Sequence, residues 1–320
     1  MENNVNNSPS SILHEVRTLK TELELRKFLD RNRGFDLSIH LRKKIKCIND
    51  FFETEGLNSC VVGLSGGIDS SLVLGLLDLA SKEPNSPIKK IRGIALPIFN
   101  IGATGQQEAL RKFELLKSSF LSQSEKIEFF EKDLTQVQEN YLRLEEGNYS
   151  PFAAGQLLSI IRIPFLYFHA ALLQDQNFRS IVVGTINRDE GAYLGFYGKA
   201  SDGMVDLQPI ADLHKNEVFE IAKSIKIPTE IIYAEPTGDV FDGRSDKEMI
   251  GANYEDIRFF ILFKDFNLDF RNFTHLLSSD TIQSFENIET LHKKNLHKYK
   301  VGLPSRFIDV MKRIVEGGWS

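Results

Sequence analysis

Residues 65–71, with the sequence SGGIDSS, combine side chains that can bind phosphate and a metal ion. They follow the apolar run 60–64 and precede a helix-like segment, which places them at the carboxyl end of a strand, where open α/β sheets bind ligands. Gly66 and Gly67 let the backbone approach an anion, and the N–H groups of the helix start point toward it. A carboxylate at Asp69 repels phosphate unless a metal ion separates the two charges. The stretch therefore predicts a phosphate-binding turn in which Asp69 is a metal ligand.

A second stretch of the same kind covers residues 182–190 and reads VVGTINRDE. An apolar strand again ends in a small residue and a hydroxyl, Gly184 and Thr185, and a carboxylate follows at Glu190. Because the carboxyl ends of parallel strands share one edge of a sheet, this strand end can lie beside the first turn. Glu190 and Asp69 would then share a Mg²⁺ that bridges the phosphates. Lys215, a single cation in a largely acidic neighbourhood, suits a phosphate partner.

Alternating strands and helices must position these residues. We expect strands at 60–64, 90–97, 126–130 and 180–184, and helices at 37–52, 70–82, 104–121 and 153–174. This alternation predicts an α/β fold, a doubly wound parallel sheet with flanking helices of the Rossmann-like kind. Pro164 should kink or break the last of these helices. Short helices at 212–225, 254–263 and 304–315 would form a cover over the sheet rather than a separate domain.

The N-terminal segment differs from the rest of the chain. Residues 1–11 are rich in Asn and Ser, which predicts disorder. From residue 12 to 34 the charges alternate over scattered leucines, which indicates a short surface helix or arm. We therefore divide the chain into a polar, partly disordered arm, 1–36, and one domain, 37–320.

Composition limits the classes of function. The 320 residues, 42% hydrophobic with 24 Phe, suffice for one large α/β domain. The net charge of −5 argues against nucleic acid as the main partner. Cys47 and Cys60 form no metal-ligand spacing, and the polar start lacks the apolar stretch of a signal peptide. No apolar run approaches the roughly 20 residues of a membrane span. We expect a cytoplasmic protein that binds no membrane.

The turn at 65–71 lacks the lysine of a Walker A loop and resembles the SGGxDS loop of the N-type ATP pyrophosphatases. Later segments resemble the NAD⁺ synthetase family in order: GTINRDE from Gly184, GFYGK from Gly195, DGMVDLQPI from Asp202, DLHKNEV from Asp212 and EPTGD from Glu235. A family-like HK pair follows at 297–298, before Pro304. The resemblance runs from about residue 37 to the C-terminus and implies the fold of the adenine-nucleotide α-hydrolases.

The resemblance also implies roles for individual residues. Catalysis would rest on Asp69, Glu190 and Lys215, and Mg²⁺ on Asp69 and Glu190. ATP would be bound by Leu64, Ser65, Gly66, Gly67, Ile68, Asp69, Ser70, Ser71, Thr185, Lys215 and Thr237. A dinucleotide substrate would be bound by Arg162, Tyr167, Lys199, Asp206, His297 and Lys298.

The implied reaction is the amidation of deamido-NAD⁺ to NAD⁺. Transfer of AMP from ATP activates the carboxylate with loss of pyrophosphate, and ammonia then displaces AMP, so that catalysis is mainly positioning and charge stabilisation. Only about 36 residues precede the first expected domain helix, and residue 2 is Glu rather than Cys. We therefore expect free ammonia, or a separate partner glutaminase, as the nitrogen source. The family resemblance further implies a homodimer.

Departures from the family pattern cluster on the substrate side and leave other functional hypotheses open. They are Gln156, Ile160, Gly198, Lys247 and Met249. Each lost contact to a dinucleotide costs roughly 1–3 kcal/mol. One alternative is an ammonia-dependent ligase of the same fold that acts on another carboxylate. Others are a tRNA-modifying pyrophosphatase, which should show a basic face and catalytic cysteines, and a non-catalytic nucleotide-binding protein.

Overall fold

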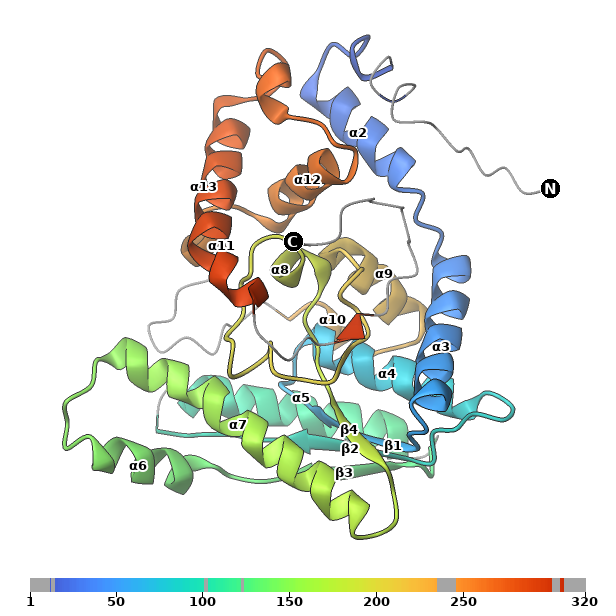
Figure 1. Ribbon diagram of the computed structural model, residues 1–320, viewed down its shortest axis with the longest axis vertical. Coiled ribbons are helices and arrows are strands. Elements are labelled where there is room, and N and C mark those ends of the chain that lie inside the picture. Colours follow the sequence, from blue (N-terminus) through green and yellow to red (C-terminus); the bar gives the residue numbers. More distant parts are fainter. Residues whose placement is uncertain are drawn as a thin grey trace.

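A parallel sheet forms the centre of the computed structural model, which describes residues 12, 15–100, 103–121, 124–234, 246–300 and 306–307 (Figure 1). The strand order is β3-β2-β1-β4-β5-β6, and every neighbouring pair is parallel. The strands are β1 (Ser59–Gly63), β2 (Lys90–Ala95), β3 (Ile127–Glu131), β4 (Ser180–Val183), β5 (Leu207–Gln208) and β6 (Arg306–Phe307). The predicted doubly wound α/β class is confirmed.

The strand order reverses at β1. The chain first builds outward from β1 through β2 to β3, and it then returns to the other side of β1 with β4. Such a reversal is the topological switch point at which open α/β sheets bind ligands. Gly63 ends β1 and Val183 ends β4, and these strands are direct neighbours. The two stretches with candidate chemistry therefore begin side by side, as predicted.

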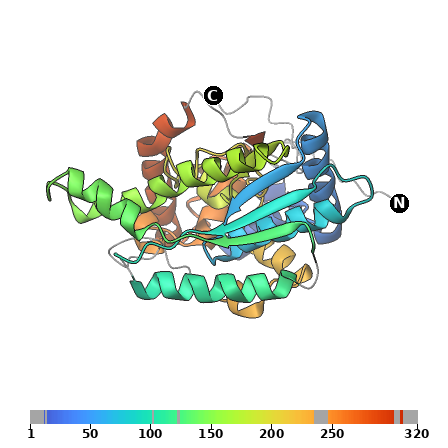
Figure 2. The ribbon, with the colours of Figure 1, turned by 90° about the horizontal axis from the view of Figure 1, so that it is seen from below.

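Helices cover both faces of the sheet (Figure 2). One face is packed by α3 (Leu37–Thr54), α4 (Ile68–Lys82), α5 (Ala103–Leu121), α9 (Lys215–Ser224) and α10 (Thr229–Ile232). The other is packed by α7 (Pro151–Gln174), which lies beside α6 (Thr135–Leu144). Successive side chains of a strand point to opposite faces. Accordingly, Cys60 and Val62 of β1 belong to the hydrophobic cluster on the face covered by α3, α4, α5, α9 and α10, whereas Val61 belongs to the cluster on the face covered by α7.

A third hydrophobic cluster lies away from the sheet. It is rich in phenylalanine, and its residues come from helices and connecting segments. The elements around it are α2 (Glu22–Arg33), α12 (Tyr254–Asp265), α13 (Ser279–Asn295), η1 (Phe270–Phe273) and α11 (Asp246–Ile250). The remaining short helices are α8 (Arg188–Gly191) and η2 (Leu296–Lys300). The expectation that the chain beyond residue 200 only covers the sheet holds for α9 but is wrong for α12 and α13.

The helix predicted within residues 12–34 is present, with a buried face. Thr21 caps its start by accepting a hydrogen bond from the backbone of Glu24 at 3.2 Å. Leu25, Phe28 and Leu29 are buried in the third cluster. Residues 1–11 lie outside the described residues, and the domain division at residue 36 stays a prediction.

Most elements expected from the sequence occur within two residues of their predicted bounds. Helices α6 and α13 and strand β5 were not expected. The helix predicted for 304–315 is wrong at Arg306 and Phe307, which pair with β5 instead; the rest of that segment lies outside the described residues. Helix α7 continues through Pro164 without a break, and the proline lies on the exposed side of the helix.

Helix α7 also corrects an expectation about membranes. By length and composition its 24 residues are apolar enough to span one. In the fold, however, Leu158, Ile161, Leu166 and Leu173 pack against the sheet. We therefore interpret α7 as a helix that covers the sheet, like the core helices of other α/β proteins.

Candidate active site

The turn between β1 and α4 is shaped by a glycine that no other residue can replace without strain. Gly66 has φ of 77°, and a Cβ there would lie 2.7 Å from the carbonyl oxygen of Ala109 on α5. Gly67, at the N-cap of α4, provides no side-chain hydrogen bond to the helix start. The hydroxyls of Ser70 and Ser71 donate to the carbonyl of Gly67 at 3.1 and 2.9 Å. The helix start therefore has no side-chain cap at the carboxyl edge of the sheet, which suits an anion.

The other loop residues differ in what they offer a ligand. Ser65 is exposed, and its hydroxyl lies 3.2 Å from that of Ser70. Leu64 and Ile68 are buried in the core cluster, so that only their backbone can face a ligand. Thr185, directly beyond β4, is half-buried.

Asp69 and Glu190 lie together, joined by one amide and one ammonium group. Nδ2 of Asn187 donates to Oδ1 of Asp69 at 3.0 Å and to Oε1 of Glu190 at 2.8 Å. Nζ of Lys215 lies 2.6 Å from Oδ2 of Asp69 and 3.7 Å from Oε1 of Glu190. The three charged side chains are only 11–20% exposed. Residues predicted to be catalytic thus meet in one cluster from three separate segments.

Two members of this cluster were not singled out as site residues from the sequence. Asn187 is fully buried and caps α8, because its Oδ1 accepts a hydrogen bond from the backbone of Glu190 at 3.1 Å. The hydroxyl of Tyr254 donates to Oε1 of Glu190 at 3.3 Å, and its ring lies 5.2 Å from Nζ of Lys215. Asn187 carried a signal in the sequence, since an Asn followed two and three residues later by acidic residues, here Asp189 and Glu190, is typical of a helix start.

Two carboxylates hold the start of α9, whose first residue is Lys215. The backbone N–H of Lys215 donates to Oδ2 of Asp189 at 2.7 Å, and Oδ1 of Asp189 lies 2.5 Å from Nδ1 of His214. The backbone N–H of His214 donates to Oε2 of Glu217 at 2.9 Å. Negative groups at a helix N-terminus are favourable because the first N–H groups carry positive partial charge.

Glu217 is charged although it is buried. Burial by itself raises the pKa of this carboxyl, but the Arg33 guanidinium and the hydrogen bonds from Arg33 and the His214 backbone outweigh it and lower the pKa to about 2. Arg33 is 2% exposed, and Nε and Nη2 each lie 3.0 Å from an oxygen of Glu217. The two side chains form a bidentate pair behind the site.

Two of the residues predicted to bind substrate contact each other beside β4. The hydroxyl of Tyr167 on α7 donates to Oδ1 of Asp206 at 3.1 Å. Oδ2 of Asp206 accepts a hydrogen bond from the backbone of Val182 at 2.8 Å. Burial, together with the nearby Asp206 charge, raises the pKa of Tyr167, so that the phenol remains a hydrogen-bond donor.

The other predicted substrate residues occupy separate places. Arg162 is on α7, and its guanidinium lies at the end of β2, where Nε donates to the carbonyl of Leu96 at 3.0 Å. Nζ of Lys298 donates to two carbonyls of the segment after α8, at 2.9 and 2.6 Å, and burial, with the nearby Lys199 charge, lowers the pKa of Lys298. Lys199 and His297 are exposed. Thr237 lies outside the described residues.

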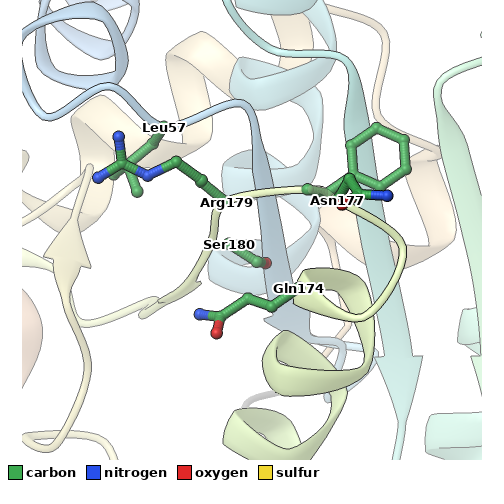
Figure 3. A pocket seen from close by; sticks show the side chains of 6 residues that line it. Leu57, Gln174, Asn177, Arg179 and Ser180 are labelled. Carbon is green, nitrogen blue, oxygen red and sulfur yellow. The ribbon is translucent and has the colours of Figure 1, made fainter.

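The cavity drawn in Figure 3 does not belong to this site. It has a volume of about 490 Å³. Its lining residues are Leu57, Gln174, Asn177, Phe178, Arg179 and Ser180. Ser180 begins β4, whereas the acidic cluster, formed by Asp69 and Glu190 with Lys215, lies beyond Val183 at the other end of that strand. The cavity is therefore at the opposite edge of the sheet.

Comparison with known proteins identifies the family of the chain. The sequence model of the NAD synthase family matches residues 40–302. The chain is 32% identical to the NH₃-dependent NAD⁺ synthetase of Methanococcoides burtonii, over 67% of this chain and 74% of that one. It is 27% identical to the enzyme of the same name from Pyrococcus horikoshii, over 84% and 96%.

Among solved structures, NMN synthetase from Francisella tularensis superimposes with a TM-score of 0.65 and 25% identity, over 85% of this chain and 100% of that one. The family match includes both strand ends of the switch point and the whole acidic cluster. The chain therefore belongs to the NAD synthase family, whose members are ligases that form a C–N bond.

Proposed function

We propose that this protein converts deamido-NAD⁺ to NAD⁺, using ammonia and ATP. The observation that carries the proposal is the meeting of Asp69, Glu190 and Lys215 beside the glycine turn at the switch point of the sheet. These are the groups needed to hold a polyphosphate: an uncapped helix start, a cation and oxygen ligands for a metal ion. The family match supports the same reaction.

The acidic pair fits a bound Mg²⁺. Asp69 and Glu190 accept from the same amide group of Asn187, so that their carboxylates lie together and would both be able to hold one ion. Mg²⁺ in nucleotide enzymes is usually held by one or two carboxylates together with phosphate oxygens and water. Among the described residues no group of three or more acidic, histidine or cysteine ligands occurs, which agrees with such a shared site. The ion, when bound, would neutralise phosphate charge.

The reaction has two steps. An oxygen of the substrate carboxylate attacks the α-phosphorus of ATP, and the bond to the β-phosphate breaks, which gives an adenylate and pyrophosphate. Ammonia then attacks the carbonyl carbon, AMP leaves with its oxygen, and a proton is released. The Lys215 ammonium, now held by Asp69 at 2.6 Å, would turn to a phosphate oxygen, and the N–H groups of α4 would hold the leaving pyrophosphate.

The residues predicted to bind the substrate favour a nucleotide that extends along α7. The Tyr167–Asp206 pair and Arg162 all lie at the carboxyl side of the sheet, on the face covered by α7. Arg162 provides a planar cation, which suits a phosphate or carboxylate. Tyr167 provides an aromatic ring with a fixed hydroxyl.

A second candidate is the amidation of the corresponding mononucleotide, which would give NMN. It is favoured by the likeness to an NMN synthetase, which the chain covers over its full length. The substrate-side departures at Ile160 and Gly198 are compatible with a shorter substrate, since Ile160 stands where the family pattern has an arginine and Gly198 where it has a threonine.

One turnover assay separates these candidates. The protein is incubated with ATP, Mg²⁺, ammonium and either deamido-NAD⁺ or nicotinate mononucleotide, and amide product and pyrophosphate are measured together. We expect stoichiometric NAD⁺ and pyrophosphate from deamido-NAD⁺, and none from an Asp69→Ala variant. Faster turnover of the mononucleotide would replace the first candidate by the second. Turnover of neither acid would refute both.

We further propose that the protein works as a cytoplasmic homodimer supplied with free ammonia or served by a separate glutaminase. The support for a dimer is the exposed apolar side chains of α7, among them Phe152, Ile160 and Phe168, which are 56%, 41% and 56% exposed. Burying such side chains against a second copy would remove apolar surface from water. Light scattering should give the mass of two chains, and Phe168→Glu should give one. A monomeric native protein would contradict this part of the proposal.

A further inference from the structure

Helix α2 contacts two helices, α9 and α12, that carry residues of the active site. It precedes residues 40–302, which match the family; it packs beside α12 and is drawn above α9 in Figure 1. α9 begins with Lys215 and α12 begins with Tyr254. The chain therefore brings an element from outside the family match to the back of the catalytic cluster.

The contact between α2 and α9 is made by one buried guanidinium. Arg33, the last residue of α2, binds both oxygens of Glu217, and its Nη2 also donates to the carbonyl of Asp212 at 2.6 Å. Glu217 in turn accepts from the backbone of His214. Arg33 thus holds the segment from Asp212 to Glu217 at both of its ends, and Lys215 lies inside that segment.

A second contact ties α2 to α12. Arg26 donates to Oδ1 of Asp256 at 2.7 Å, and Asp30 pairs with Arg258 at 2.8 Å. These ion pairs are half-buried, and the apolar face of α2 packs beneath them in the third cluster. The position of α2 is therefore fixed by α12, and Arg33 extends from this fixed helix to α9.

We propose that α2 is a positioning element of the active site, in which Arg33 holds the first turn of α9 and thereby keeps Lys215 beside Asp69 and Glu190, within reach of a bound phosphate. This inference rests on the proposed function for what Lys215 does, but not for the contact itself. Arg33 is buried, so it acts through Glu217 and Asp212 rather than on a ligand. Lys215 is the first residue of α9, so a shift of the helix start moves its ammonium group away from the phosphates.

The test removes the contact without leaving a buried charge. Arg33→Met alone would leave the buried carboxylate of Glu217 without its guanidinium partner and risk unfolding. The variant therefore combines Arg33→Met with Glu217→Gln. Glutamine can still accept the hydrogen bond of His214 at the third helical position. The matched control is Arg31→Met, which removes an exposed arginine from the same helix.

Hydrogen exchange and kinetics are measured on both variants and on the native protein. In the double variant we expect faster exchange in residues 212–218 and in no other helix start. We also expect a kcat lowered about tenfold or more, with a KM for ATP changed less than about threefold. The control should behave as the native protein in both measurements.

Two results would overturn the inference. One is native exchange in residues 212–218 of a folded double variant. The other is slower turnover with exchange raised throughout the protein, because that pattern indicates general destabilisation. If the native protein forms no NAD⁺, the proposed function fails, and the exchange measurement still decides whether Arg33 positions α9.

Discussion

Replacing Asn187 by serine isolates the contribution of one buried amide to the active site. Asn187 is fully buried, and its oxygen caps α8 by accepting from the backbone of Glu190 at 3.1 Å. Its Nδ2 donates to Asp69 at 3.0 Å and to Glu190 at 2.8 Å. Serine is as good a helix cap as asparagine, but it has no amide to bridge two carboxylates. The substitution therefore removes the bridge and keeps the cap.

The size of the effect follows from the two lost bonds. A hydrogen bond to a charged group contributes roughly 1.5–3 kcal/mol. Without the amide, the two carboxylates repel each other, although Lys215 still lies beside both of them. If half of the lost energy is specific to the productive geometry, kcat/KM falls roughly 10- to 100-fold. The Mg²⁺ concentration for half-maximal rate should rise by a similar factor, because the two ligands are no longer held together.

The assay is a titration of Mg²⁺ at fixed ATP and deamido-NAD⁺, with a thermal melt of the same sample. Asn49→Ser is the matched control, because its Nδ2 donates to the carbonyl of Ala80 at 2.9 Å, far from the carboxylates. The control should lower the melting temperature and leave the Mg²⁺ dependence unchanged. A folded Asn187→Ser variant with native kcat/KM and native Mg²⁺ dependence would refute the assigned role of the bridge.

Three further predictions concern the turn, the buried acid and the tyrosine. Gly66→Ala should lower the free energy of unfolding by roughly 1–3 kcal/mol and abolish ATP binding, because a Cβ at a φ of 77° would also clash with Ala109. The control is Gly147→Ala, where φ is 86° but the surrounding space is open, and it should bind ATP as the native protein does in calorimetry. Because the folded pKa of Glu217 is about 2, below the ordinary 4.5, its stabilisation is present above pH 4.5 and lost as pH falls toward 2. In denaturant unfolding, the difference in free energy of unfolding between the native protein and Glu217→Gln should therefore be smallest at the lowest pH. A difference that stays constant with pH would contradict this prediction. Tyr254→Phe removes only the hydroxyl at 3.3 Å from Glu190 and should lower kcat/KM less than about tenfold in the turnover assay; a larger loss would give this hydroxyl a direct role in the reaction.

The sheet and the first half of the site could be predicted from the sequence because their signals are local. The run 60–64 is apolar on both faces, as a central parallel strand requires, and the glycines follow it directly. The same reasoning located the strand end before Glu190. It also placed the two strand ends together, since a parallel sheet aligns the carboxyl ends of its strands.

The rest of the site depends on contacts between residues far apart in the chain. Arg33 and Glu217 are 184 positions apart, and each looks like an ordinary charge on a helix surface in the sequence. Tyr254 gave no local sign of a hydrogen bond to Glu190. Strands β5 and β6 have two residues each, too short for any alternating pattern. Only the packing of α2, α9 and α12 makes these residues part of one arrangement.

Four residues of the catalytic cluster share one structural position, the first turn of a helix. Asp69, Glu190, Lys215 and Tyr254 occupy it in α4, α8, α9 and α12. A side chain at a helix start moves with the whole helix, so the geometry of the cluster depends on how these helices are held against one another. Catalysis that relies on positioning loses rate steeply with small displacements. Contacts behind the cluster, such as that of Arg33 with Glu217, should therefore affect turnover more than their distance from the substrate suggests.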